Sequence, residues 1–267
     1  MANKSFNIIV SFLIKLKITK IINLLFILFN KNIRIKKEKE LYYVYSDSYK
    51  IYFYLLERLY IFFQGIEFRF KKLFYEYFLN DIDFEEGDSV VDCGAHLGEL
   101  LYYFKDKKIN YYAFEPSQKL CECIKNNIEI NKGHYQNYKI VNKALLDSTG
   151  KVTIYLRDST ADTSLEADNF SESVNIDSVR LDEYFNENTF IKLLKIDAEG
   201  YEYEVLKGSE NILSSIKFIA VDAGFERSSK TESTFDQVNN FLLSKNFILL
   251  KKNLDRHTFL YRNSNID

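Results

Sequence analysis

The stretch that decides the fold is VVDCGAHLGE, residues 90–99. It places Gly94 and Gly98, two of the nine glycines of the chain, after an acid and on either side of a histidine. An apolar run that leads into small residues is typical of a tight turn between a buried strand and a helix. Because glycine lets a ligand approach the backbone closely, the same turn is a candidate ligand cradle.

The spacing of these residues narrows the class of ligand. Asp92, Gly94 and Gly98 form D-x-G-x-x-x-G, which is not the dinucleotide fingerprint G-x-G-x-x-G. It is not a P-loop either, since no Lys-Ser/Thr pair follows. A phosphate cradle is therefore disfavoured. The alternative to any ligand is that both glycines serve only the turn and the packing of the helix behind it.

Glu115 ends the next predicted strand, 23 residues after Asp92. In related α/β sites an acid about 20 residues beyond the glycine turn binds the ribose hydroxyls. A carboxylate can accept two hydrogen bonds from a vicinal diol. The turn and the acid together predict a ribose-containing ligand. The other interpretation of Glu115 is a surface carboxylate in a loop.

Strand-like and helix-like segments alternate from residue 88 onward, which is typical of a parallel sheet covered by helices. The run at 190–196, FIKLLKI, predicts a central strand that is buried on both faces. The last two segments predict a hairpin. The predicted strands are 89–95, 110–116, 138–146, 190–200, 217–224, 247–253 and 257–263, and the predicted helices are 97–107, 117–132, 201–215 and 233–246.

An insertion at 150–185 separates the third and fourth of these strands. We expect short strands there, joined by a polar loop rich in Asp, Ser and Thr. Because such groups bind sugar hydroxyls, the loop offers candidate substrate contacts. A solvated loop is the alternative. The candidates are Asp158, Asp162, Thr163 and Ser164.

Composition bounds the class of protein. The chain has 267 residues, of which 46% are apolar, so it can bury a sizeable core. Its net charge of −2 argues against a general nucleic-acid binder, because such domains usually carry a basic excess. Three cysteines, an odd number, predict a reduced, cytosolic chain, and their spacing lacks the second pair of a zinc site.

The first 80 residues differ from the rest. Residues 1–40 hold nine Lys or Arg against two acids, and residues 6–30 form an apolar stretch broken by Lys15, Lys17 and Lys20. Its longest uncharged run has ten residues, whereas a membrane span needs about 20. The stretch predicts either a helix in a membrane interface or a helix that packs on the domain or a partner chain. Residues 41–80 are expected to continue as helices, with the main domain beginning near Asp81.

Four blocks carry a resemblance to a known family. VVDCGAHLGE, YAFEPS, NKALLD with GKVTIY, and LLKIDAEGYEYEVLKGS occur in order and together strongly resemble the FkbM-type methyltransferases, which use S-adenosylmethionine. The resemblance runs from about residue 84 to about 252. It implies an α/β fold: the seven-stranded class I methyltransferase (Rossmann-like) sheet, with a last antiparallel strand beside the fifth. To this the chain adds the N-terminal helical extension.

The resemblance also implies a set of cofactor-binding residues. The glycine turn would line the methionine and ribose parts of S-adenosylmethionine, Glu115 would hold the ribose hydroxyls, and the end of the third strand would lie near the base. The implied residues are Asp92, Gly94, Ala95, His96, Gly98, Glu115, Pro116, Ser117, Asn142 and Ala144.

The catalytic candidates are Asp197, Glu199 and His96. Asp197 ends the central strand, where it could take a proton from an acceptor hydroxyl or bind a divalent ion, although no metal is indicated. Glu199 could share either task, and Lys195 could pair with one of them. Capping of the following helix is the alternative for both acids. His96 is either a proton shuttle or a turn histidine satisfied by the backbone.

The predicted function is S-adenosylmethionine-dependent O-methylation of a hydroxyl of a sugar, a polysaccharide or a lipid-linked glycan. The chain lacks the N/D-P-P-Y/F motif of enzymes that methylate base amino groups. We expect a cytoplasmic enzyme, peripheral on the inner face of the membrane through residues 6–30, with no nucleic-acid partner. The alternatives are a non-catalytic membrane-associated scaffold that retains the cofactor fold and a methyltransferase for another small molecule.

Overall fold

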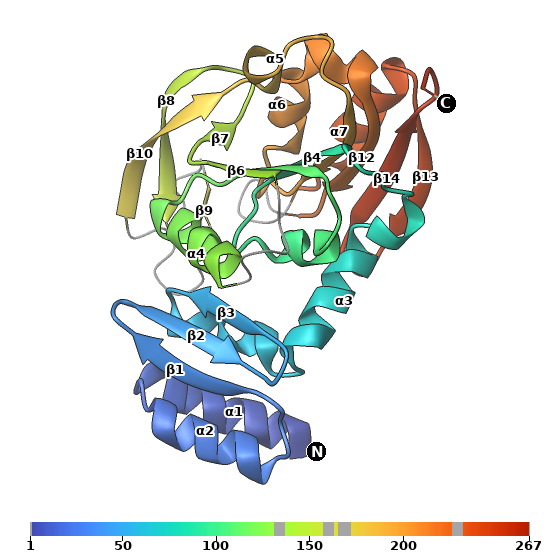
Figure 1. Cartoon of the computed structure of the whole chain (residues 1–267). Coiled ribbons are helices and arrows are strands. Elements are labelled where there is room, and N and C mark those ends of the chain that lie inside the picture. The colour runs from blue at the N-terminus through green and yellow to red at the C-terminus, as the bar shows by residue number, and fades with distance from the viewer. Residues whose placement is uncertain (1, 131–136, 157–162, 165–171, 226–231, 267) are drawn as a thin grey trace.

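A seven-stranded sheet forms the centre of the computed structural model, which describes residues 2–130, 137–156, 163–164, 172–225 and 232–266 (Figure 1). The strand order is β13-β14-β12-β11-β4-β5-β6. Five strands run parallel, and β14 inserts antiparallel between β12 and β13. This is the predicted methyltransferase sheet, with its closing hairpin. The strands are β4 (Ser89–Cys93), β5 (Asn110–Phe114), β6 (Asn137–Val141), β11 (Ile191–Ile196), β12 (Ile216–Asp222), β13 (Phe247–Asn253) and β14 (Thr258–Asn263).

Alternate side chains of these strands fill two cores, one on each face of the sheet. On one face Val91, Leu194 and Ile219 pack against α5 (Leu181–Tyr184), α6 (Glu202–Lys207), η4 (Glu210–Ser215) and α7 (Phe235–Ser244). On the other face Val90 and Leu193 pack against α3 (Ile66–Glu76), η2 (Leu79–Asp81), η3 (Glu99–Phe104) and α4 (Gln118–Glu129). A central strand buried on both faces requires the continuous apolar runs seen in the sequence.

The predicted helices are present, two of them in altered form. Ser117 caps α4 as expected, its hydroxyl accepting from the N–H of Leu120 at 3.4 Å. The helix expected at 97–107 is the short 3-10 helix η3, which ends at Phe104, two residues before Asp106 with its φ of +66°. The helix expected at 201–215 is divided between α6 and η4.

The insertion and residues 144–145, from the end of the predicted third strand, form a small second sheet with strand order β7-β10-β8-β9. Its strands are β7 (Ala144–Leu145), β8 (Gly150–Leu156), β9 (Thr163–Ser164) and β10 (Glu172–Val179). The expectation of short strands is confirmed. Asp158 and Asp162 lie outside the described residues.

The N-terminal segment, here residues 2–80, contains strands as well as the expected helices. Helices α1 (Ala2–Lys15) and α2 (Thr19–Leu28) are followed by an antiparallel sheet of β1 (Arg34–Glu38), β2 (Leu41–Tyr45) and β3 (Lys50–Phe53), and then by η1 (Leu56–Phe62). The prediction of helix is therefore wrong for residues 41–53. LYYVY and KIYF favour strands because aromatic and β-branched side chains pack well on a pleated surface. Lys39, with φ of +54°, makes the turn between β1 and β2.

The N-terminal segment packs on the α4 side of the main domain, below it in Figure 1. One buried cluster joins Phe62 and Phe70 to Leu97 and Leu120. The side chain of Asn127 on α4 accepts from the backbone N–H of Tyr52 at 2.6 Å and donates to its carbonyl at 3.2 Å. The domain boundary near residue 81 stays a prediction. Within the described part of the chain, no helix has both the length and the apolar character needed to cross a bilayer.

Candidate active site

Gly94 makes the turn at the carboxyl end of β4. Its φ is +72°, and its N–H donates to the carbonyl of Phe114 at 3.0 Å. A Cβ built on Gly94 would lie 2.0 Å from the backbone oxygen of Asp197. No side chain fits there, so the close approach of the turn to the end of β11 requires glycine.

Gly98 closes the same turn from the other side. It has a φ of +73°, and a Cβ there would lie 3.1 Å from Cγ2 of Ile124 on α4. Gly98 thus sets how closely the turn packs on α4. This contact is the packing role that the sequence offered as the alternative to ligand binding.

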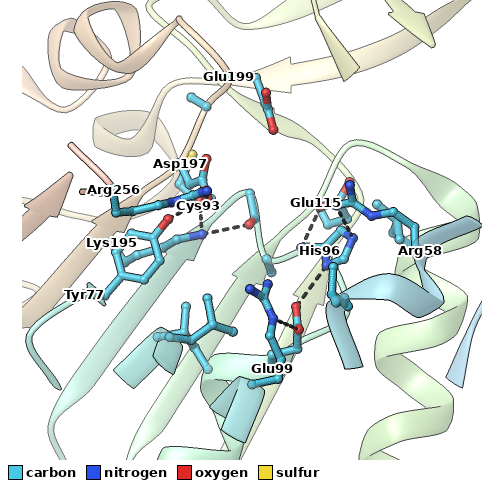
Figure 2. A pocket seen from close by; sticks show the side chains of 18 of the residues that line it. Arg58, Tyr77, Cys93, His96, Glu99, Glu115, Lys195, Asp197, Glu199 and Arg256 are labelled. Atoms are coloured by element: carbon cyan, nitrogen blue, oxygen red, sulfur yellow. Dashed lines mark hydrogen bonds and ion pairs between the residues drawn. The ribbon is translucent and has the colours of Figure 1, made fainter. Parts of the chain in front are cut away.

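A cavity of about 940 Å³ opens at the carboxyl edge of the sheet (Figure 2). Its wall contains most of the predicted site residues: Gly94, Ala95, His96, Glu115, Pro116, Ala144, Asp197 and Glu199. Four other predicted residues are not part of this wall: Asp92, Gly98, Ser117 and Asn142.

Glu115 is buried, and its carboxylate anchors the turn. One oxygen accepts from the backbone N–H of His96 at 2.9 Å, and the other accepts from the N–H of Ser117 at 2.9 Å. Burial raises the pKa of Glu115 to about 7, although both backbone donors oppose this shift. Each oxygen keeps acceptor capacity beyond its backbone bond, and the residue lies in the cavity wall. A vicinal diol would satisfy that capacity.

Asn142 holds the loop that follows Glu115. Its side-chain amide donates to the carbonyl of Glu115 at 2.9 Å and to that of Pro116 at 2.8 Å. Ser117 caps α4 and donates its N–H to Glu115. The structure thus gives both residues the task of shaping the edge at which the resemblance expects the adenine.

Asp92 and Lys195 form a buried ion pair beneath the turn, with 2.9 Å between Asp92 Oδ1 and Lys195 Nζ. The hydroxyl of Tyr111 also donates to Asp92. Lys195 donates to the carbonyls of Cys93 and Gly94 at 2.9 and 2.8 Å. The pair therefore fixes the end of β4, and Lys195 pairs with Asp92 rather than with Asp197 or Glu199 as the sequence suggested.

Asp197 stands across the cavity from Glu115 (Figure 2). Its Oδ2 accepts from the hydroxyl of Tyr77 at 2.6 Å and lies 3.3 Å from a guanidinium nitrogen of Arg256. Burial alone would raise its pKa, but Lys195 and Arg256 hold the pKa of Asp197 below its usual value. Its Oδ1 is buried and has no hydrogen-bond partner among the described residues.

Arg256 bridges two carboxylates at the ends of β11 and β12. Besides Asp197, its Nε lies 2.9 Å from Oδ2 of Asp222. Burial and the neighbouring Asp197 raise the pKa of Asp222, against the effect of Arg256. The guanidinium balances the charge of the two acids and fixes the position of the Asp197 side chain.

His96 has both ring nitrogens engaged. Its Nε2 lies 3.1 Å from a guanidinium nitrogen of Arg58, and its Nδ1 lies 2.9 Å from Glu99. Because a guanidinium can only donate, Nε2 accepts and the ring proton is on Nδ1. Burial lowers the pKa of His96. Both partners of the ring are side chains, whereas the sequence offered either a proton shuttle or a ring bound by the backbone.

The capping alternative for Asp197 and Glu199 does not match the start of α6. Glu202 accepts there, from the backbone N–H of Ala198 at 3.2 Å and of Gly200 at 2.9 Å. Glu199 has a φ of +51° and lies above Asp197 in Figure 2, with its carboxylate pointing down between Asp197 and Glu115. Among the described residues there is no group of three or more His, Cys, Asp or Glu side chains arranged to hold a metal ion.

Several residues of the site were missed from the sequence. Tyr77 and Arg58 come from the N-terminal segment, and Arg256 comes from the turn between β13 and β14. Glu99 pairs with Arg69 at 2.8 Å and thereby orients His96. The one local signal was the position of Glu99, three residues after His96, which allows a contact within one helical turn.

The comparison with protein families identifies the class of enzyme. The model of the methyltransferase FkbM domain matches residues 92–249, which is more than half of the chain. The chain belongs to the FkbM methyltransferase family. Membership confirms the predicted methyltransferase class, for which the sequence predicts S-adenosylmethionine as the cofactor. No match was found among curated proteins.

Solved structures show remote similarity. A SAM-dependent methyltransferase from Aquifex aeolicus is 16% identical, with 73% of this chain and 96% of that chain covered and a TM-score of 0.41. The magnesium protoporphyrin IX methyltransferase from Synechocystis PCC 6803, solved with bound SAM, is 9% identical, with 73% and 78% covered and a TM-score of 0.46. TrmK from M. capricolum, solved with S-adenosylhomocysteine, is 13% identical, with 72% and 68% covered and a TM-score of 0.41.

The described residues fit this cofactor. Gly94 lies in the cavity wall, where it holds the turn against the end of β11, and the buried Glu115 retains acceptor capacity toward the cavity. An adenosyl ribose supplies the two hydroxyl donors that such a carboxylate needs. The fit supports the predicted cofactor-binding roles, which remain predictions residue by residue.

Proposed function

We propose that this protein transfers a methyl group from S-adenosylmethionine to a hydroxyl of a sugar, a polysaccharide or a lipid-linked glycan. The observation that carries the proposal is that Asp197 lies in the cavity wall and that its buried Oδ1 has no hydrogen-bond partner in the part of the chain that the structure describes. A buried carboxylate oxygen without a donor is costly, and an acceptor hydroxyl would provide that donor. Glu115 stands on the other side of the same cavity (Figure 2).

In this proposal the cofactor, once bound, supplies an electrophilic methyl group. Glu115 accepts hydrogen bonds from the ribose hydroxyls, and the turn at Gly94 forms the adjoining part of the cavity wall. Asp197 accepts a hydrogen bond from the substrate hydroxyl and aligns its oxygen with the methyl group. With the methyl group supplied from the bound cofactor to the hydroxyl oxygen, Asp197 would take the proton that the hydroxyl loses.

The neighbours of Asp197 adapt it to this task. Because its pKa is lowered, Asp197 is charged at neutral pH and acts chiefly as a fixed acceptor that takes the proton late. Tyr77 and Arg256 hold Oδ2, which leaves Oδ1 to the substrate. Glu199 at the rim is a second acceptor for the substrate. We assign His96 a positioning role, since its backbone N–H holds Glu115.

A polar acceptor agrees with the chemistry of the cavity wall, to which Asn7, Gln64 and Lys143 also contribute. We propose an acceptor in polysaccharide biosynthesis and a cytoplasmic location. All three cysteines are free and buried, as in a reducing compartment. We also propose that residues 6–30 bring the protein to the inner face of the membrane.

Titration calorimetry tests the cofactor site. S-adenosylmethionine should bind the wild-type protein, and Glu115→Ala should weaken binding by at least about tenfold, because a buried acceptor of two hydroxyls is lost. Asp197→Asn should keep the affinity for the cofactor. A wild-type protein that does not bind the cofactor would support the non-catalytic scaffold instead.

Radiolabelled methyl transfer tests the chemistry. Tritium from the methyl group of S-adenosylmethionine should enter a glycan or glycolipid extract of the source cells as an ether, which mild base does not cleave. Asp197→Asn should remove this incorporation while cofactor binding persists. Label that mild base releases as methanol would indicate carboxyl methylation and would refute the proposed acceptor.

A further inference from the structure

Helices α1 and α2 expose a large apolar surface. Seven apolar side chains on these helices and two that directly follow them are exposed, among them Phe12 at 60%, Leu24 at 53% and Leu28 at 69%. The full set, here called the outer apolar face, is Ile8, Ile9, Phe12, Leu16, Ile21, Leu24, Ile27, Leu28 and Phe29. Soluble proteins rarely leave so many neighbouring apolar side chains in water without a binding role.

The opposite side of each helix is buried in the protein. Phe6 and Val10 of α1 and Ile22 and Phe26 of α2 are buried in the cluster that includes β1 to β3. The two helices lie side by side at the end of the molecule away from the central sheet (Figure 1). The outer apolar face is thus separate from the side by which the two helices pack on the rest of the protein.

The charge around this face selects its partner. Residues 2–37 contain eight Lys or Arg and no Asp or Glu. Lys15, Lys17 and Lys20, which are exposed, lie between and beside the apolar positions. Long basic side chains beside an apolar surface fit an anionic lipid interface, in which the stems lie against the acyl chains and the ammonium groups reach the headgroups. Two copies of so basic a face would repel each other.

The cavity of the active site reaches this face. Its wall includes Asn7 and Ser11 of α1 and Lys31, which follows α2, as well as Gly94 and Asp197 at the other end. On a helix with 3.6 residues per turn, Asn7 and Ser11 lie between the buried row that contains Val10 and the outward row that contains Phe12. The outer end of the cavity therefore borders the outer apolar face.

We propose that α1 and α2 seat the protein on an anionic membrane surface, with the outer end of the cavity at the lipid headgroups, so that the acceptor is a membrane-anchored glycan. This inference rests on the proposed function for the chemistry and narrows its substrate class. The head of such an acceptor passes Asn7, Ser11 and Lys31 and reaches Asp197, while its lipid stays in the bilayer.

Vesicle co-sedimentation of the full chain tests the docking. The wild-type protein should sediment with vesicles of phosphatidylcholine mixed with phosphatidylglycerol. Leu24→Glu should lower its partition coefficient by at least about tenfold. Leu243→Glu is the matched control, because Leu243 is 50% exposed on α7, another surface helix, and should bind as the wild type does. Replacing Lys15, Lys17 and Lys20 by Gln should cost about fivefold for each lysine, on anionic vesicles only.

Cysteine labelling tests the position of the cavity. Ser11→Cys is at its outer end, and Ser214→Cys is on η4 at the opposite edge of the sheet; the native cysteines are buried. Anionic vesicles should slow the reaction of a maleimide with Ser11→Cys and leave Ser214→Cys unchanged. If Ser11→Cys reacts at the same rate with and without vesicles, although the protein sediments with them, the proposed delivery of the acceptor from the membrane is wrong.

The outcomes separate this inference from the proposed function. If the protein binds S-adenosylhomocysteine but not anionic vesicles, the proposed membrane docking is wrong and the proposed methyl transfer is unaffected. Binding to vesicles without binding of the nucleoside overturns the proposed function. Self-association in solution that Leu24→Glu abolishes, without vesicle binding, would assign the outer apolar face to a second copy of the chain.

Discussion

The hydroxyl of Tyr77 donates a 2.6 Å hydrogen bond to Oδ2 of Asp197, although 120 positions separate the two residues in the chain. Tyr77 follows α3, outside the region that the family model matches, whereas Asp197 follows β11. The contact joins the N-terminal segment to the candidate catalytic residue. It also makes Tyr77 a positioning residue whose removal has a defined effect.

Tyr77→Phe should shift the pH dependence of methyl transfer. The hydrogen bond from Tyr77 lowers the pKa of Asp197, so its loss raises that pKa and moves the acidic limb of the rate profile to higher pH. At neutral pH we expect kcat to fall about tenfold, equivalent to about 1.4 kcal/mol of transition-state stabilisation, with little change in cofactor affinity. An unshifted profile would mean that Tyr77 only fills space.

Cofactor affinity should depend on pH through Glu115. Its pKa in the free protein is about 7, and a diol binds the charged form, so affinity should rise with pH up to about pH 7 and level off above it. Below pH 7 the change approaches about tenfold per pH unit. Calorimetric titration with S-adenosylhomocysteine at several pH values measures this slope. Glu115→Gln should bind weakly and without the slope.

Gly94→Ala should be severely destabilising. The new Cβ would meet the backbone oxygen of Asp197 at 2.0 Å, and relief requires that β4 and β11 separate at their carboxyl ends. Gly87→Ala is the matched control, because Gly87 also has a positive φ, +92°, but has no atom within 4 Å of the built Cβ. We expect about 1–2 kcal/mol for the control, from backbone strain alone, and more for Gly94→Ala in urea unfolding.

Lys195→Met should leave Asp92 as a buried charge without its cation. Loss of one partner of a buried pair typically costs about 3–5 kcal/mol. Lys192→Met, on the same strand, should cost about 1 kcal/mol, because the pair of Lys192 with Asp88 is longer, 3.5 Å, and less buried. Thermal unfolding of the two variants compares them directly. Equal losses would show that the Asp92–Lys195 pair does not support the turn.

The sequence predicted the cofactor side of the site better than the acceptor side. The glycine turn and Glu115 follow from local patterns, because a strand that ends in a turn places its last residues at one edge of a parallel sheet. Tyr77 is one of 20 tyrosines, and nothing local distinguishes it. Arg256 contacts Asp197 only because β14 inserts beside β12, and no local sequence pattern around either residue predicts this pairing.

The strands at 34–53 show the same limit at the level of secondary structure. Tyr, Phe, Ile and Lys recur there at spacings that fit a helix face as well as an alternating strand. The choice is made by packing: β3 lies against α4, and Asn127 bonds both backbone groups of Tyr52. These tertiary contacts act in the same direction as the strand propensity of the aromatic and β-branched residues.

The path of the cavity wall has a practical consequence for trimmed versions of the enzyme. The family match begins at residue 92, but Arg58 and Tyr77 lie before it. A fragment cut to the matched region would also lack α3, the first residues of β4 and the whole of β14. We expect such a fragment not to fold, so a shortened enzyme that still binds the methyl donor must keep the chain from α3 to β14.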